Sequence, residues 1–186
     1  MKLILRKEVK EKTLQLNDEY CKMADERIYN KVISLTEFKE AKTVCLFVSA
    51  FGEPNTLPII ENALSLGKKV ALPLCVDGSN MVFKIIESMD DVSAGMYGIL
   101  EPREHCCEMD PLSIEFMLVP CVTCNKEGHR LGHGRGYYDR FFGMVSNAGG
   151  KGPFKCVVCR GALMNDEIPV DDYDVKMDAV IWEDCE

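Results

Sequence analysis

One segment limits the possible folds more than any other: a strand, a helix and a second strand follow one another within the first half of the chain. A continuous apolar run such as TVCLFVSA (43–50) is typical of a strand that is buried on both faces. A helical pattern covers residues 56–66, and Gly67 stands where helices commonly end in a left-handed residue. A second strand is predicted by KVALP (69–73). Two strands joined through a helix form a parallel crossover unit, which indicates an α/β fold.

Patterns on both sides of this unit complete the predicted fold. Apolar residues recur every three or four positions within residues 1–40, which favours two helices, with Asn17 or Asp18 as a cap. A turn signal before residues 81–86 predicts a hairpin, so the sheet should be mixed. Three later strands are predicted from IEFMLVPCV (114–122), FKCVVCR (154–160) and DAVIWED (178–184). We therefore expect a single domain over residues 1–186 with a three-layer α/β/α structure and a mixed, mainly parallel sheet.

The charge of the chain excludes several classes of partner. The 186 residues carry a net charge of -8 at pH 7, whereas nucleic acids and anionic membranes are drawn by positive fields. An anionic ligand must therefore be met by a local cluster of basic residues. The opening MKLILRKEVK has too few apolar residues for a signal peptide or a membrane span. We expect a cytoplasmic monomer that binds small molecules, with no nucleic-acid or membrane partner.

Ten cysteines are unusual in a chain of this kind. Without a secretion signal, we expect reduced thiols rather than a disulfide framework. Two pairs have C-x-x-C spacing, Cys121 with Cys124 and Cys156 with Cys159, and together they could supply four thiolates to a zinc ion. Each pair also lies beside a valine-rich run, where cysteine packs as a small hydrophobic residue. We favour the packing interpretation and keep a zinc-stabilised interaction module as the alternative.

The chemistry concentrates in one short stretch, RLGHGRGYYDRFF (130–142). Three of its glycines alternate: Gly132, Gly134 and Gly136. Because they lack Cβ atoms, backbone N–H groups can converge there on an anion, and a helix predicted to begin near Tyr137 adds the positive end of its dipole. Three arginines lie in the same stretch: Arg130, Arg135 and Arg140. Guanidinium groups suit phosphate oxygens, so the stretch predicts a phosphate site.

Neither of the common nucleotide-binding signatures is present in this stretch. A P-loop needs Gly-Lys-Ser/Thr after a gap of four residues, and the dinucleotide fingerprint needs a third glycine later than Gly136. A dinucleotide loop also joins a strand directly to a helix, whereas a polar turn intervenes here. Taken alone, the glycines are also compatible with an ordinary tight loop, and it is the arginines that favour phosphate.

Acidic residues near this stretch leave two interpretations open. Asp139 in the first helical turn can cap the helix dipole, or it can hold magnesium beside a phosphate through its carboxylate oxygens. A loop near the C-terminus offers more carboxylates: Asp171, Asp172, Asp174 and Asp178. The residues alone do not decide among these carboxylates.

The stretch 130–142, together with VPCVTCNKEGH before it, resembles the signature of the 5-formyltetrahydrofolate cyclo-ligase family, also called the 5,10-methenyltetrahydrofolate synthetases. Four further segments resemble the family in the same order: KLILRKEV (2–9), SAFGEPNT (49–56), YGILEP (97–102) and IPVDDYDVKMDAVIWED (168–184). A glycine motif alone would be weak support, but five matching segments span nearly the whole chain.

The resemblance implies an enzyme with a compact three-layer α/β fold. Its implied reaction converts 5-formyltetrahydrofolate and ATP into 5,10-methenyltetrahydrofolate, ADP and phosphate, with magnesium. The formyl oxygen takes the γ-phosphoryl group, a neighbouring nitrogen attacks the activated carbon, and phosphate leaves, so no enzyme nucleophile is needed. The protein has to position two anionic substrates and stabilise charge during phosphoryl transfer.

The resemblance also assigns roles to residues. Lys2 and Arg6 are expected to bind ATP with nine residues of the glycine stretch: Arg130, Leu131, Gly132, His133, Gly134, Arg135, Gly136, Tyr137 and Tyr138. Three residues are expected to act in the reaction: Arg135, Tyr138 and Asp139. Eight residues are expected to contact the folate: Val48, Glu53, Tyr97, His133, Gly134, Arg135, Gly136 and Tyr137. Asp139 and Asp174 are expected to hold magnesium.

Alternatives remain at several of these positions. Without the resemblance, Lys2 and Arg6 would be assigned to a solvated helix face, and Tyr97 suits core packing as well as stacking on a folate ring. The sequence departs from the family's pattern at Cys121, where a glycine is common, and at His133. A rival function of another class is a related fold that binds sugar phosphates or CoA through the same glycine loop.

Overall fold

The computed structural model describes residues 1–78, 80–95 and 99–185. Its centre is a six-stranded sheet with the order β10-β9-β6-β1-β2-β3. Five strands run parallel, and β3 alone is antiparallel to its neighbour β2. The strands are β1 (Thr43–Cys45), β2 (Lys69–Cys75), β3 (Met81–Ile86), β6 (Phe116–Val119), β9 (Phe154–Val158) and β10 (Ala179–Ile181). The expected α/β fold with a mixed, mainly parallel sheet is confirmed.

Five α-helices and two small hairpins surround the sheet in the described ranges. The helices are α1 (Lys2–Thr13), α2 (Asp18–Ser34), α3 (Thr36–Glu40), α4 (Leu57–Ser65) and α5 (Tyr137–Asn147). The hairpin strands are β4 (Val92–Ala94), β5 (Leu100–Pro102), β7 (Thr123–Cys124) and β8 (Arg130–Leu131), and single 3-10 turns cover Met89–Asp91, Pro111–Ser113 and Gly161–Leu163. No helix in the described ranges is long and apolar enough to cross a membrane.

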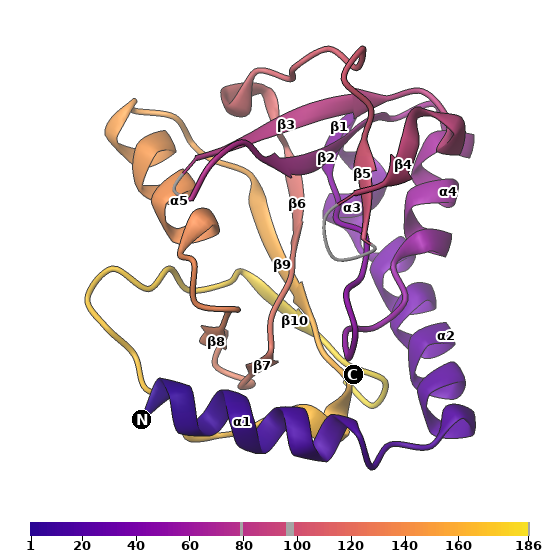
Figure 1. Ribbon diagram of the computed structural model, residues 1–186. Coiled ribbons are helices and arrows are strands. Elements are labelled where there is room, and N and C mark those ends of the chain that lie inside the picture. Colours follow the sequence, from indigo (N-terminus) through magenta and orange to yellow (C-terminus); the bar gives the residue numbers. More distant parts are fainter. Residues whose placement is uncertain (79, 96–98, 186) are drawn as a thin grey trace.

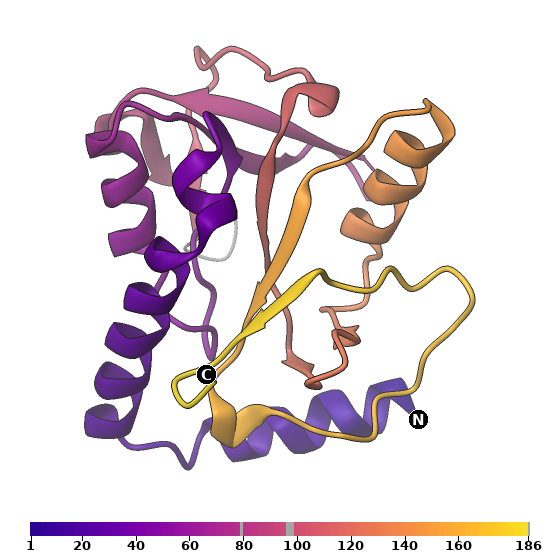
Figure 2. The same cartoon turned by 180° about the vertical axis from the view of Figure 1, so that it is seen from behind.

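Helices cover both faces of the sheet (Figures 1 and 2). Side chains alternate along a strand, so β6 sends Phe116 and Leu118 into one core cluster and Met117 and Val119 into the other. The first cluster also holds apolar residues of α2, α3 and α4, and the second holds those of α1 and α5. The two clusters confirm the predicted three layers.

The N-terminal region and the first strand differ from the sequence prediction. Asn17 does cap α2, where its side chain accepts the N–H of Tyr20, but three helices occupy residues 1–40 instead of two. The chain turns after α2 at Leu35, and the short α3 buries Phe38 under the sheet. The strand predicted over 43–50 ends at Cys45, because the chain then leaves the sheet to form a loop at its carboxyl edge.

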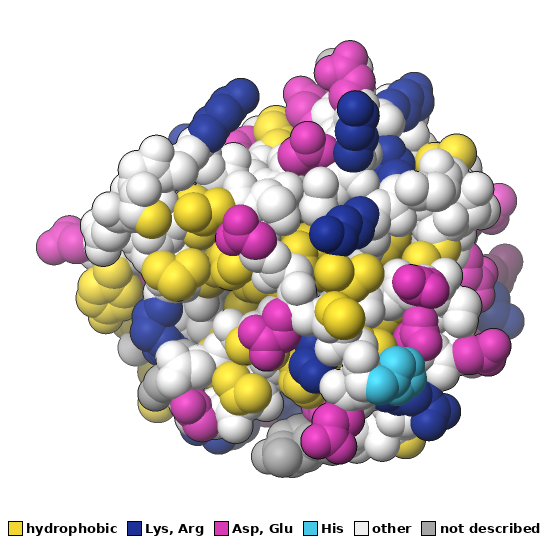
Figure 3. Space-filling view, turned by 90° about the horizontal axis from the view of Figure 1, so that it is seen from above, with side chains coloured by type: hydrophobic (Ala, Val, Ile, Leu, Met, Phe, Trp, Pro, Cys, Tyr) yellow, Lys and Arg dark blue, Asp and Glu magenta, His cyan; other side chains and the backbone are white. Residues whose placement is uncertain are grey.

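The edge of the sheet at β3 is covered by the chain itself. The N–H of Ile85 donates to the carbonyl of Cys107, and the N–H of Met109 donates to the carbonyl of Phe83. Backbone groups that an edge strand would expose are thereby partly satisfied. On this side of the molecule, acidic and basic side chains are interspersed among apolar ones (Figure 3).

Candidate active site

The glycine stretch forms a loop between β8 and α5. Gly134 has φ +99° and Gly136, the N-cap of α5, has φ +67°, a region that only glycine enters without strain. The start of α5 at Tyr137 confirms the predicted helix. Because the loop ends at a helix N-terminus, its N–H groups and the helix dipole favour an anion there.

Each alternating glycine leaves room for one guanidinium group. A Cβ on Gly132 would come within 3.0 Å of the Arg130 side chain, and one on Gly136 within 3.0 Å of Arg140. A Cβ on Gly134 would lie 3.4 Å from Arg6, which reaches the loop from α1 and donates through Nε to the carbonyl of Gly132 at 2.8 Å. The glycines therefore serve a second purpose that the sequence pattern did not reveal, which is to let arginines from two helices and a strand pack against the loop.

A cavity of 490 Å³ opens over this loop. All eleven residues that the sequence predicted for ATP binding line it, as do Asp139 and Asp174. Arg130 is almost fully buried, with a side chain 5% exposed, and it donates through Nη2 to Asp139 at 2.7 Å. Arg135, in contrast, is exposed at the rim. The cavity is thus rich in cations, although the protein as a whole is acidic.

The N-terminus of α1 lies beside the C-terminal loop (Figure 1), and residues of both segments line this cavity. Lys2 Nζ lies 2.7 Å from Asp171 and 2.5 Å from Asp174, residues about 170 positions later in the chain. Burial alone would lower the pKa of Lys2, but the hydrogen bonds that its ammonium donates to both aspartates outweigh burial and raise that pKa above its usual value. The same contact lowers the pKa of Asp171.

The two tyrosines at the start of α5 point to different neighbours. Burial raises the pKa of Tyr138 well above its usual value, so its phenol keeps its proton as a hydrogen-bond donor. The guanidinium of Arg130 lies 5.9 Å from the centre of the Tyr138 ring. The Tyr137 hydroxyl donates to the carbonyl of Asp77, in the turn between β2 and β3, at 2.7 Å.

A second cavity, of 400 Å³, adjoins the first. Glu53 lines it with a side chain only 5% exposed. One carboxylate oxygen of Glu53 accepts the N–H of Ala50 at 2.8 Å, and the other lies 2.8 Å from Nε2 of His133. Arg6 and His133 line both cavities. These two side chains therefore form the boundary between a cationic cavity and one that contains a buried carboxylate.

Two of the predicted folate contacts do not join this arrangement in the described structure. Val48 is half-buried, packs against the first core cluster and lines neither cavity. Tyr97 lies outside the described residues. Ile99, two positions later, does line the second cavity.

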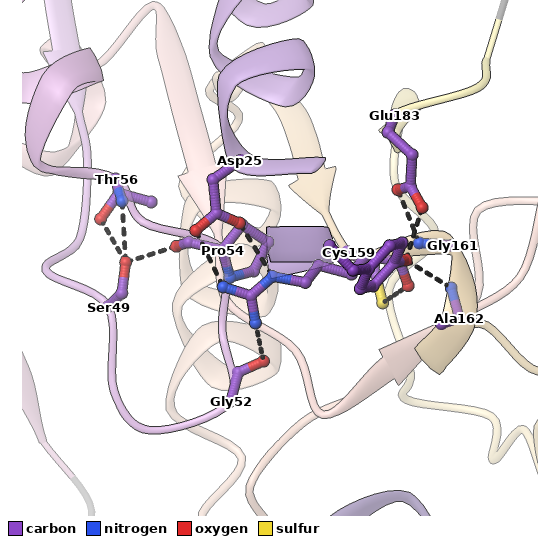
Figure 4. Close-up of polar contacts among 11 residues, drawn as sticks. Asp25, Ser49, Gly52, Pro54, Thr56, Cys159, Gly161, Ala162 and Glu183 are labelled. Atoms are coloured by element: carbon purple, nitrogen blue, oxygen red, sulfur yellow. Dashed lines mark hydrogen bonds and ion pairs between the residues drawn. The ribbon is translucent and has the colours of Figure 1, made fainter. Parts of the chain in front are cut away.

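The loop that carries Glu53 (residues 49–56) is held by hydrogen bonds at its base (Figure 4). The Ser49 hydroxyl donates to the carbonyl of Pro54 at 2.5 Å and also accepts the N–H of Thr56 at 2.8 Å. The Thr56 hydroxyl, which is fully buried, donates to the carbonyl of Phe47. Hydroxyl groups thus replace backbone pairing where the chain leaves the sheet.

Arg160 secures the same loop from a distance and was missed by the sequence analysis. It is 7% exposed, and its Nε and Nη2 bind both carboxylate oxygens of Asp25 at 2.8 and 2.9 Å. Its Nη1 donates to the carbonyl of Gly52 at 3.1 Å (Figure 4). Because Gly52 directly precedes Glu53, this guanidinium fixes the backbone of the carboxylate that lines the second cavity.

The turn after Arg160 is fixed in its own right. Glu183 accepts the N–H of Gly161 at 2.8 Å, and the hydroxyl of Tyr20 donates to Glu183 while accepting the N–H of Ala162 at 3.0 Å (Figure 4). Burial, reinforced by the hydrogen bond to Glu183, raises the pKa of Tyr20 to about 12. The phenol therefore stays a hydrogen-bond donor at neutral pH, and the backbone that follows Arg160 is held in place.

The fold and the loop define an α/β protein with a glycine-rich anion site at a helix N-terminus and a second, carboxylate-bearing cavity beside it. Comparison with known sequences is more specific. A model of the 5-formyltetrahydrofolate cyclo-ligase family matches residues 1–183, and the chain belongs to that family. Family membership indicates 5-formyltetrahydrofolate cyclo-ligase activity and confirms the resemblance seen in the sequence.

Individual relatives agree with this assignment. The chain is 31% identical to a probable 5-formyltetrahydrofolate cyclo-ligase of Caenorhabditis elegans, over 98% of this chain and 89% of the relative. It is 30% identical to a protein of the same description from Schizosaccharomyces pombe, over 89% and 90% of the two chains. A solved 5,10-methenyltetrahydrofolate synthetase of Aquifex aeolicus is similar in fold with a TM-score of 0.83, at 30% identity over 99% of this chain and 90% of that one.

Proposed function

We propose that this enzyme uses ATP and magnesium to convert 5-formyltetrahydrofolate into 5,10-methenyltetrahydrofolate, with release of ADP and phosphate. The observation that carries the proposal is the meeting of two cavities at Arg6 and His133. One cavity offers cations and a glycine loop to phosphates, and the other offers a buried carboxylate to a neutral heterocycle. Transfer of a phosphoryl group between two substrates requires such adjoining sites.

The first cavity fits the phosphates of ATP on two grounds. A Cβ at Gly132 or Gly136 would crowd an arginine, so the loop is built to bring guanidinium groups close to its backbone. Nε of Arg130 is buried and has no hydrogen-bond partner in the described part of the chain. An unpaired buried donor is costly, and a phosphate oxygen would satisfy it. We place Lys2 and Arg6 on the same phosphates, with Arg135 at the exposed rim.

Asp139 and Asp174 fit a magnesium ion bound with those phosphates. Oδ1 of Asp139 accepts from both Arg130 and the N–H of Val175. Oδ2 of Asp174 accepts from both Lys2 and the N–H of Asp171. Among the described residues, the other oxygen of each carboxylate has no hydrogen-bond donor, so each could serve as a hard oxygen ligand. Bound there, magnesium would neutralise charge on the transferred phosphoryl group.

Glu53 is the residue we assign to the pterin ring. A carboxylate accepts hydrogen bonds from the paired N–H donors of such a ring, and a buried one does so with little competition from water. One oxygen of Glu53 is already held by Ala50, which fixes its orientation. The other contacts His133, whose side chain is 52% exposed and can turn away when the folate arrives.

The chemistry then needs positioning and charge stabilisation rather than an enzyme nucleophile. The formyl oxygen attacks the γ-phosphorus and ADP leaves, which makes the formyl carbon electrophilic. The neighbouring folate nitrogen attacks that carbon and loses its proton, and the C–O bond breaks to release phosphate. We propose that Arg135 and the protonated Tyr138 stabilise the negative charge that develops on the transferred oxygens.

A direct assay tests this proposal. The purified chain, mixed with 5-formyltetrahydrofolate, ATP and magnesium, is expected to develop the near-ultraviolet absorbance of the methenyl product. Omission of ATP or magnesium, or the Asp139→Ala change, should prevent that increase. Folded protein that yields no absorbance with all components present would refute the proposal. Protection against thermal unfolding by sugar phosphates or CoA, but not by ATP with magnesium, would favour the rival function.

All ten cysteines are free, which suits a reducing compartment. We therefore propose that the enzyme works in the cytoplasm.

A further inference from the structure

Three of the ten cysteines meet beside the second cavity. The Sγ atoms of Cys121, Cys124 and Cys159 all lie within 4.8 Å of one another, and all three residues are buried. Cys121 and Cys124 follow β6, and Cys159 follows β9, the strand paired with β6. Because neighbouring parallel strands end at the same edge of a sheet, the fold brings these thiols together from two distant segments.

Cys156 does not belong to this group. It faces the first core cluster, whereas Cys159, three positions later, faces the second. The four-thiolate set suggested by the two C-x-x-C pairs is therefore not formed. Cys156 behaves as the buried hydrophobic residue that we expected, and it provides a matched control for the other three.

The geometry of the three thiols is close to that of a metal site. A zinc–sulfur bond of about 2.3 Å in a tetrahedral site places sulfur atoms roughly 3.8 Å apart. The three sulfurs would have to approach by about 1 Å at most, which small rotations of their side chains can provide. Simple hydrophobic packing would explain single buried cysteines, but it gives no reason for three sulfurs to be mutual neighbours.

One member of the group borders a cavity. Cys121 lines the second cavity, whereas Cys124 and Cys159 do not and are buried. A metal held by the three thiolates would therefore lie next to that cavity, where its fourth position could take an exchangeable ligand, as in zinc sites with three protein ligands. A divalent ion with three thiolates carries one net negative charge, and two cations, Arg6 and Lys10, line the same cavity.

We propose that Cys121, Cys124 and Cys159 bind one thiophilic metal ion of the zinc class, with its fourth coordination position open to the second cavity. This site is separate from the magnesium carboxylates, which line the first cavity. Its existence does not depend on the proposed reaction.

Metal titration of the full-length reduced protein tests the proposal. Cobalt(II) serves as the probe, because cobalt–thiolate bonds produce intense near-ultraviolet charge-transfer absorption and tetrahedral coordination produces visible bands. We expect one cobalt per chain, displaced by an equimolar amount of zinc. Cys124→Ser and Cys159→Ser should each weaken cobalt affinity at least tenfold, whereas Cys156→Ser should leave it unchanged.

A second control addresses the one other group of three closely spaced ligand residues in the described ranges, formed by Asp91, His105 and Cys106. His105→Ala should not alter the cobalt spectrum if the three thiols are the ligands. The wild-type titration is decisive even if a cysteine variant fails to fold. No cobalt–thiolate absorption from wild-type protein with ten titratable thiols, or loss of binding in His105→Ala, would overturn the proposal.

Discussion

The two loops that border the candidate active site are built in different ways. The glycine loop at residues 130–136 takes most of its shape from its own sequence, because left-handed glycines lie within it and α5 begins directly after it, although Arg6 of α1 also holds the carbonyl of Gly132. The loop at residues 49–56 takes much of its shape from elsewhere: Arg160, 108 positions away from Gly52, holds its backbone. One half of the site is thus encoded mainly by nearby residues, whereas the other half depends on the completed fold.

The difference is also one of charge placement. The cations of the glycine loop line a cavity that a ligand can enter, and even the buried Arg130, which pairs with Asp139, keeps an Nε without a partner in the described part of the chain. Arg160 is instead buried in an ion pair with Asp25, which satisfies its charge without any ligand. We therefore expect substitutions in the glycine loop to weaken ATP binding. Substitutions behind the loop at residues 49–56 should lower both the folding stability and the affinity for the folate.

The largest effect is expected from Arg160→Met. Removing one partner of a buried ion pair leaves Asp25 uncompensated, which typically costs about 3–5 kcal/mol. For a chain of this size, the unfolding midpoint should fall by roughly 6–20 °C. The KM for 5-formyltetrahydrofolate should rise more than the KM for ATP, because the Gly52 carbonyl loses its donor. Thermal unfolding and steady-state kinetics measure both effects.

The double variant Asp25→Leu with Arg160→Met separates the two roles. Removing both charges should restore much of the lost stability, but the Gly52 carbonyl still lacks its donor and the folate KM should stay high. A double variant with normal folate KM would show that Arg160 only stabilises the fold.

Arg135→Ala is expected to have the next largest effect, but on activity with ATP and not on stability. Arg135 is exposed, so the unfolding free energy should change by less than about 0.5 kcal/mol. Loss of a charged donor from the transferred phosphoryl group should lower kcat/KM for ATP by about a hundredfold. Lys7→Ala, an exposed cation on α1 that lines neither cavity, is the matched control and should retain activity. Equal losses in both variants would indicate a general charge effect.

Gly134→Ala should have a smaller effect that still distinguishes conformation from function. At φ +99° an alanine is strained by about 1–2 kcal/mol, and its Cβ would contact Arg6. Gly67→Ala is the control, since Gly67 has φ +68° but open space around it. Both variants should lose similar stability, yet only Gly134→Ala should raise the KM for ATP. A normal KM in Gly134→Ala would mean that the position of Arg6 against the loop is unimportant.

The smallest effect concerns the contact between Lys2 and Asp171. The pKa of Asp171 is lowered by Lys2, so the stability from this carboxylate is present above its unfolded pKa of about 3.9 and is lost as pH falls through the lower folded value. The midpoint difference between wild type and Asp171→Asn should be constant from pH 6 to 8 and shrink below about pH 4. Unfolding curves measured across pH check the sign, and a difference that widens in acid would contradict it.

Sequence patterns predicted what local residues determine. The crossover unit, the start of α5 near Tyr137 and a cap at Asn17 or Asp18 follow from periodicity and from turn chemistry; the structure contains all three, with Asn17 as the cap. The magnesium and phosphate roles of the glycine stretch came from charge and from the family resemblance, and they remain proposals.

The contacts that sequence could not predict all join distant segments. Nothing near Arg160 in the sequence indicates Asp25 as its partner, because the pair forms only when α2 packs against the end of β9. The grouping of Cys121 and Cys124 with Cys159, rather than with Cys156, depends on which way each side chain points as β9 ends. The spacing of residues in the sequence gives the candidate partners in such cases, and the register of the sheet decides which of them meet.

A structure with a non-hydrolysable ATP analogue and 5-formyltetrahydrofolate bound would show whether the two substrates meet at Arg6 and His133, where the two cavities adjoin. We predict the γ-phosphorus about 3–3.5 Å from the formyl oxygen at this boundary, with Glu53 on the pterin ring and no longer on His133. Phosphates outside the glycine loop, or a folate bound away from Glu53, would contradict the proposed function.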